Sequence, residues 1–237
     1  LDSLLSDAYG VIGAVNLFYH FDFPAAERNY KRALELAPNN LEIYKYFSEM
    51  KSFKGEFAEA LEWDQRGIEV DPSFSTRDGL YGTQLYFAGQ KDSAIIFLTK
   101  MVGQFPVCHY YLGIIYLIEG EYEKSIGELE KTLTGFSPLA ITHLGIAYSR
   151  SGAPDETRRM LDTLLARNRT EFVPQSMIGS LMAELGRNKE AMDYLRKGYE
   201  EREEFILLIM NMDTLSYRDL RSDPAFLEVM GKVKMKE

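Results

Sequence analysis

A single glycine recurs along this chain at nearly constant spacing. The steps are 34, 31, 32 and 34 residues, between Gly55, Gly89, Gly120, Gly152 and Gly186. Each glycine is followed closely by an acid, Lys, Pro or Asn and then by a second apolar stretch. Because glycine commonly ends a helix, this period predicts a repeating unit of helix, glycine turn and second helix.

Small residues occupy two fixed positions of this unit. Position eight holds Ala14, Ser48, Gly82, Gly113, Gly145 and Gly179, and position twenty holds Ala26, Ala60, Ala94, Ser125, Thr157 and Ala191. Antiparallel helices about 8 to 10 Å apart need short side chains where they cross. The pattern therefore predicts an all-α stack of closely packed helix pairs.

The units resemble tetratricopeptide repeats. They combine the small residues with Tyr116 and Tyr148 at position eleven, glycine at position fifteen and proline near position thirty-two. The resemblance implies a right-handed superhelical solenoid of antiparallel helix pairs. We expect six repeats within residues 1–205, at 7–40, 41–74, 75–105, 106–137, 138–171 and 172–205, and a C-terminal capping segment at 206–237.

A narrower resemblance is carried by both ends of the array. The stretch from Phe21 to Arg28 and the closing stretch from Asp219 to Phe226 are similar to the C-terminal tetratricopeptide arrays of bacterial multidomain regulators. In those regulators the array follows an adenylate cyclase, winged-helix transcription factor or serine/threonine kinase domain. The resemblance implies a regulatory or assembly module. The start at Leu1, without Met, also predicts a fragment of a longer protein.

The last stretch has the features of a capping helix. Ser222 or Asp223 can accept hydrogen bonds as N-cap, and Pro224 suits the first helical position. An end repeat exposes an apolar face that needs a cover. We expect Phe226 and Leu227 to cover the sixth repeat.

Composition restricts the function. The charge is 27 − 36 = −9 with pI near 5.0, which argues against nucleic acid as a direct ligand. The single cysteine cannot form an internal disulfide, and no apolar run reaches the roughly 18 to 20 residues that span a membrane. We therefore expect a cytoplasmic protein without direct membrane contact.

No residue pattern predicts catalysis. Cys108 and His109 are the one suggestive pair, but adjacent helical residues point about 100° apart and cannot act as nucleophile and base. His20 and His143 are isolated in the sequence, and no metal or phosphate motif occurs. We expect no enzyme and no cofactor.

The candidate site is the inner wall, which the first helix of each repeat lines in such solenoids. An apolar protein or peptide segment, or the upstream domain of the parent chain, is the expected partner. Two alternatives stay open, in which the same side chains fill a tight superhelix or pack on the N-terminal segment, or form a homodimer interface. A small-molecule sensor is a further alternative, which a deep pocket with a perturbed titratable group would support. The predicted groove residues are Phe18, Tyr19, Lys45, Glu49, Phe53, Tyr86, Phe87, Tyr110, Ile114 and Leu117.

Overall fold

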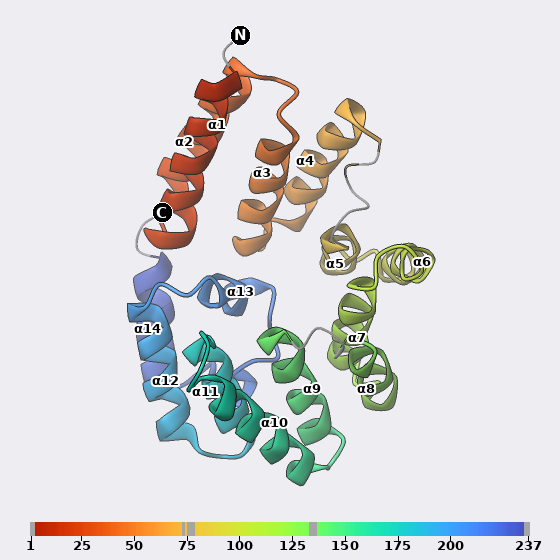
Figure 1. Ribbon diagram of the computed structural model, residues 1–237, viewed down its shortest axis with the longest axis vertical. Helices are drawn as coiled ribbons and strands as arrows, with labels where there is room; N and C mark the ends of the chain where they lie inside the picture. The colour runs from red at the N-terminus through yellow and green to blue at the C-terminus, as the bar shows by residue number, and fades with distance from the viewer. Residues whose placement is uncertain (1–2, 73, 75–78, 133–136, 235–237) are drawn as a thin grey trace.

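The computed structural model describes residues 3–72, 74, 79–132 and 137–234, which fold into fourteen α-helices (Figure 1). The first twelve form six consecutive antiparallel pairs that curve around a common centre. This arrangement confirms the expected all-α solenoid of helix pairs. The pairs are α1 (Ser3–Ala14) with α2 (Phe23–Leu36), α3 (Leu41–Phe53) with α4 (Phe57–Val70), α5 (Leu80–Phe87) with α6 (Lys91–Met101), α7 (Cys108–Ile118) with α8 (Tyr122–Glu130), α9 (Pro138–Arg150) with α10 (Pro154–Arg167), and α11 (Gln175–Glu184) with α12 (Asn188–Glu200).

The recurring glycines lie in the turns between the two helices of a pair. All five have left-handed backbone, with φ between 72° and 86°, at Gly55, Gly89, Gly120, Gly152 and Gly186. A side chain is strained in this conformation, which explains why glycine occupies these turns. The first pair differs, because Phe21 takes the left-handed conformation there with φ of 53°.

The helices of a pair touch through the small residues. A Cβ atom added at Gly113 in α7 would lie 2.6 Å from Leu129 in α8, and one at Gly82 in α5 would lie 2.5 Å from Leu98 in α6. Real Cβ atoms essentially never approach a non-bonded atom this closely. Each glycine therefore lets its two helices approach as closely as they do.

Hydroxyl groups strengthen two of these crossings. Ser125 Oγ donates to the carbonyl of Gly113 over 2.8 Å, and Thr157 Oγ1 donates to the carbonyl of Gly145 over 2.9 Å. Both donors are fully buried residues at position twenty, and both acceptors stand at position eight. Both buried hydroxyl groups therefore have a hydrogen-bond partner.

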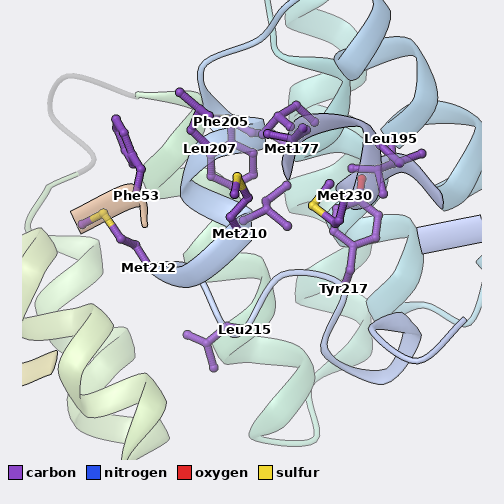
Figure 2. Packing of buried hydrophobic residues seen from close by; sticks show 14 of the residues in the cluster. Phe53, Met177, Leu195, Phe205, Leu207, Met210, Met212, Leu215, Tyr217 and Met230 are labelled. Atoms are coloured by element: carbon purple, nitrogen blue, oxygen red, sulfur yellow. The ribbon is translucent and has the colours of Figure 1, made fainter. Parts of the chain in front are cut away.

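Helix α13 (Phe205–Asn211) lies inside the curve of the solenoid, between α3 and α11 (Figure 1). Ile206, Leu207 and Ile209 are fully buried, in a cluster that also contains Phe53 of α3 and Met177 of α11 (Figure 2). The start of the expected capping segment thus fills part of the inner space. Buried residues of the first two repeats, of α13 and of the repeats from the fourth onwards belong to one hydrophobic cluster. A second cluster holds the third repeat and the start of the fourth.

The first and last repeats also meet directly. The ring of Phe21 lies 6.0 Å from that of Tyr199, and the guanidinium of Arg202 lies 5.4 Å from the Phe21 ring. Nearby, Asn211 Nδ2 donates to the carbonyl of Phe53 over 2.9 Å, across 158 residues of sequence. These contacts close the solenoid into a ring.

Tyr217 fixes the segment that follows α13. Its hydroxyl donates to the carbonyl of Ser176 over 2.7 Å. A Cβ atom at Gly179 would lie 2.1 Å from that hydroxyl and 2.9 Å from the carbonyl oxygen of Ala191. Gly179 therefore leaves room both for the crossing of α11 with α12 and for Tyr217.

Helix α14 (Pro224–Lys234) covers α12, after one 3₁₀ turn, η4 (Arg218–Leu220). Asp223 Oδ1 accepts from the backbone N–H of Ala225 over 2.7 Å, which confirms an N-cap. Phe226 is buried as expected, but the expectation for Leu227 is wrong, because 56% of this residue is exposed. The two side chains point about 100° apart on the helix, so only Phe226 faces α12.

The glycine crossings can be tested with a matched pair of substitutions. Gly113→Ala should lower the free energy of unfolding by about 1 to 3 kcal/mol, because the new methyl group overlaps the buried Leu129. Gly127 lies within α8 with no neighbouring atom within 4 Å of its added Cβ, so Gly127→Ala should raise stability by up to about 1 kcal/mol. Urea unfolding of both variants measures the difference, and equal effects would show that Gly113 is not a crossing.

Candidate functional site

Side chains of successive repeats meet along the inner wall. The Tyr110 hydroxyl lies 3.2 Å from His143 Nδ1, 33 residues further along the chain. Arg150 Nη2 donates to Glu184 Oε1 over 2.6 Å, across 34 residues. Stacked repeats therefore bring together polar groups that lie about one repeat apart in the sequence.

Three of the predicted groove residues line one pocket of about 110 Å³. They are Phe87 at the end of α5 and Tyr110 and Ile114 on α7. Helix α13 forms the opposite side, where Leu208 faces the same space. Helices α5, α7, α9 and α13 thus enclose a pocket at this place, where the sequence predicted part of a continuous open groove.

The pocket is apolar except for a small polar cluster. His143 on α9 and Asp213, just after α13, both line it and are almost fully buried. Asp213 Oδ1 accepts from the backbone N–H groups of Leu215 and Ser216 over 3.1 and 3.0 Å. Asp213 Oδ2 lies 3.4 Å from His143 Nε2 and accepts no hydrogen bond.

The electrostatics of this cluster favour an ionised carboxylate. Burial raises the pKa of Asp213, but the positive charge of His143 and hydrogen bonds from Ser216 outweigh it and lower the pKa from 3.8 to about 2. Burial also raises the pKa of Tyr110 well above its usual value. Asp213 therefore remains charged, and Tyr110 keeps its hydroxyl proton, at neutral pH.

Two predicted groove residues belong to the core. Phe53 and Leu117 are only 3% and 2% exposed, within the cluster that contains α13. For Phe53 the insertion of α13 is the physical reason, because α13 packs against α3 and Asn211 donates to the carbonyl of Phe53. Neither side chain is exposed enough to contact a partner.

In the first repeat, a π-helical turn changes which side chains face the inner wall. Helix α1 continues into a π-helical turn, η1 (Val15–Tyr19), which adds a residue per turn and rotates the side chains that follow. Leu17 is fully buried there, whereas Tyr19 is 59% exposed. Phe18 is half-buried, with its ring 6.0 Å from that of Phe53.

The remaining predicted residues lie outside the pocket. Lys45 and Glu49 are neighbours on α3, with Nζ 3.7 Å from Oε1. The Tyr86 hydroxyl donates to Glu119 Oε1 over 2.6 Å, and its pKa is raised by burial and by this hydrogen bond. The structure does not bring these polar residues to the pocket.

His143 and Asp213 are the site residues that sequence reasoning missed. His143 stands 33 residues after Tyr110, but it is the sixth residue of its repeat whereas Tyr110 is the fifth, so the repeat register points to Thr142 instead. Asp213 lies after the last repeat, so its place in the fold is set by how α13 enters the solenoid and not by the repeat pattern. No local signal identifies it.

Other candidate groups do not form a catalytic arrangement. Cys108 is buried in the core, while His109 Nδ1 lies 2.6 Å from Glu128 Oε2 on α8. In the part of the chain that the structure describes, no three His, Cys, Asp or Glu side chains come together to hold a metal ion. None of the described helices has the length and apolar character to cross a membrane.

Comparison with known proteins establishes the fold. PilW, a type IV pilus biogenesis factor, matches with a TM-score of 0.58 and 14% identity, over 96% of this chain and 97% of that one. A tetratricopeptide repeat protein from Parabacteroides merdae matches with a TM-score of 0.50 and 17% identity, over 96% of this chain and 99% of that one. Yeast Tom70 matches with a TM-score of 0.54 and 12% identity, over 87% of this chain and 46% of that one. The fold is that of a tetratricopeptide repeat solenoid.

Matches at the sequence level are absent. No protein-family model and no curated protein sequence matches the chain. The similarity to solved structures therefore supports the fold alone.

The buried carboxylate predicts a pH dependence of stability. Because the folded-state pKa of Asp213 lies below the ordinary value, its contribution is present above pH 3.8 and is lost as the pH falls towards 2. The difference in free energy of unfolding between wild type and Asp213→Asn should therefore shrink on acidification, by on the order of 2 kcal/mol. Urea unfolding across this pH range measures it, with Asp162→Asn on the exposed side of α10 as control. A constant difference would show that His143 does not hold the carboxylate ionised.

Proposed function

We propose that the chain is a non-catalytic protein-binding scaffold. A segment of the partner docks at the pocket between α5, α7, α9 and α13 and inserts an apolar side chain. The observation that carries the proposal is the half-buried aromatic lining of Phe87 and Tyr110, in a pocket that α13 leaves unfilled. Aromatic anchors in concave sites typically carry much of the affinity of a protein interface.

Helix α13 supports the choice of an apolar segment. Its Phe205 and Leu208 line the pocket, as does Met212 directly after it. A partner with apolar side chains would add to the apolar contacts that the pocket residues already make with α13. The net charge of −9 favours a basic or neutral partner and faster association at low salt.

The proposed context is a larger bacterial regulator. The stretches from Phe21 to Arg28 and from Asp219 to Phe226 resemble those that open and close the tetratricopeptide arrays of such proteins. In this context the scaffold is a regulatory or assembly module, and the partner is either a separate protein or an upstream domain of the same chain.

A peptide selection tests the proposal without knowledge of the partner. Phage-displayed peptides selected against the chain should carry apolar anchors. Phe87→Ala and Tyr110→Ala should weaken their binding by about 2 kcal/mol, or roughly 30-fold, because each removes a contact of the pocket.

The matched control is Ile96→Ala, an exposed residue on the outer helix α6. Circular dichroism establishes that all variants fold. Peptides that bind the folded pocket variants and wild type equally would place the binding surface elsewhere.

Self-association is the second candidate, and the exposed face of α1 and η1 favours it. In the described part of the chain, five exposed apolar residues lie on this face at helical spacing: Leu4, Val11, Ile12, Val15 and Tyr19. An end face of a solenoid is normally covered by a neighbouring repeat. A second copy offers the same apolar surface, so a two-fold pair would cover both faces.

Light scattering after size exclusion distinguishes this candidate. A dimeric wild type that becomes monomeric in Val11→Glu/Ile12→Glu would support it, because two carboxylates would have to be buried at the interface. Ile96→Glu places the same charge on an exposed apolar site of α6 and should leave the mass unchanged. A monomeric wild type at high concentration would exclude the candidate.

A further inference from the structure

The pocket between α5, α7, α9 and α13 is lined by nine apolar or aromatic side chains and three polar ones. The nine come from all four helices and from the residue directly after α13. The three polar side chains are Thr83, His143 and Asp213. What the pocket can bind depends on whether these three have hydrogen-bonding groups left for a ligand.

The polar side chains are engaged with the protein itself. Thr83 Oγ1 donates to a backbone carbonyl of its own helix over 2.7 Å. Asp213 Oδ1 accepts from two backbone N–H groups, and Oδ2 is shielded from solvent, 3.4 Å from His143 Nε2. His143 Nδ1 lies 3.2 Å from the Tyr110 hydroxyl and 3.0 Å from the carbonyl oxygen of Leu139. These groups therefore hold one another in place and offer a ligand no accessible charge.

We propose that this pocket binds a small, neutral, apolar molecule, up to about the size of a single hydrocarbon ring. The volume sets the size. A cavity of about 150 Å³ lined by Leu, Ile and Phe stays dry and holds benzene or xenon. This pocket measures about 110 Å³ and is partly open, so one edge of a ring can remain at its mouth.

The lining favours an apolar occupant. Aromatic rings from three helices reach the pocket, at Phe87, Tyr110 and Phe205, and aromatic side chains bind a further ring through edge-to-face or offset contacts. Water in an apolar pocket finds few hydrogen-bond partners. An apolar molecule that displaces this water therefore gains affinity.

The engaged polar groups exclude a polar or charged ligand. A hydroxyl or amide group that enters the pocket loses its hydrogen bonds to water and gains none in return, which costs free energy. An ionised group costs more still, and a carboxylate would also approach Asp213. The ligand is therefore neutral as well as apolar.

An apolar group can reach the pocket from two sources, a free molecule or a side chain of the partner in the proposed function. The inference concerns the free molecule, and it requires no protein partner. A pocket of this volume holds one such group at a time. A bound molecule would therefore exclude the anchor of the partner and regulate its docking.

The test compares benzene with pyrazine, a ring of the same size that carries nitrogen atoms on opposite sides. Whichever way pyrazine enters, at least one nitrogen lies inside the pocket. Titration of the intact chain, followed by methyl chemical shifts, should show saturable binding of benzene beside Ile114 and Leu139. Pyrazine should bind at least about tenfold more weakly, because nothing in the pocket replaces the water on its buried nitrogen.

Three variants locate the site. Leu208→Trp should fill the pocket and abolish binding of benzene, and Ile114→Phe should fill the same space from α7 and act in the same way. Leu227→Trp, at an exposed leucine of α14, should leave binding unchanged. The methyl shifts of wild type locate benzene independently if neither filling variant folds.

Competition distinguishes the two sources. Saturating benzene should weaken binding of the selected peptides that depend on Phe87 and Tyr110, because both ligands need the same space. Benzene that binds the pocket without weakening these peptides overturns the regulation. Benzene binding when no peptide depends on the pocket supports the free molecule and contradicts the proposed function.

The inference itself is overturned by any of three results. The first is the absence of saturable benzene binding by wild type, and the second is equal binding of benzene and pyrazine. The third is binding that a folded filling variant leaves unchanged. Peptides that depend on the pocket while benzene does not bind would overturn the small-molecule site and leave the scaffold.

Discussion

Close approach of helices through residues without large side chains is the constraint on which this structure depends. At the crossing of α7 and α8, Gly113 offers no side chain and Ser125 donates a hydrogen bond to its carbonyl. This contact lets the rest of each helix bury larger residues, such as the neighbouring Leu129. Repetition of the same crossing gives the stack its curvature and places the first helix of every pair on the inner wall.

The insertion of α13 converts this wall into a site. Without it, Tyr110 and Phe87 would belong to an open groove, and with it they line a pocket that ends at Asp213. Burying Asp213 costs free energy, which His143 and two backbone N–H groups offset. The arrangement is a buried pair of carboxylate and histidine at one end of the pocket.

Sequence reasoning was effective where the signal is local and periodic. The turn at Gly152, the small residue at Ala60 and the N-cap at Asp223 are all read from neighbours within one or two turns of a helix. It was weaker for the site, because an apolar stretch such as Phe205 to Asn211 is equally compatible with covering an end and with filling the inside. The bond from Asn211 to Phe53 spans 158 residues, and no local pattern encodes a contact at that distance.

The meeting of Phe21 with the last repeat restricts how this array can change. Phe21 stands at the position of a turn glycine and accepts a strained backbone, and its ring is what touches Tyr199 and Arg202. An open solenoid can gain or lose a unit without disturbing the others. In this chain an inserted or deleted unit would carry Tyr199 away from Phe21 and open the closed ring. The contact between the first and the last repeat therefore fixes the number of repeats in this chain.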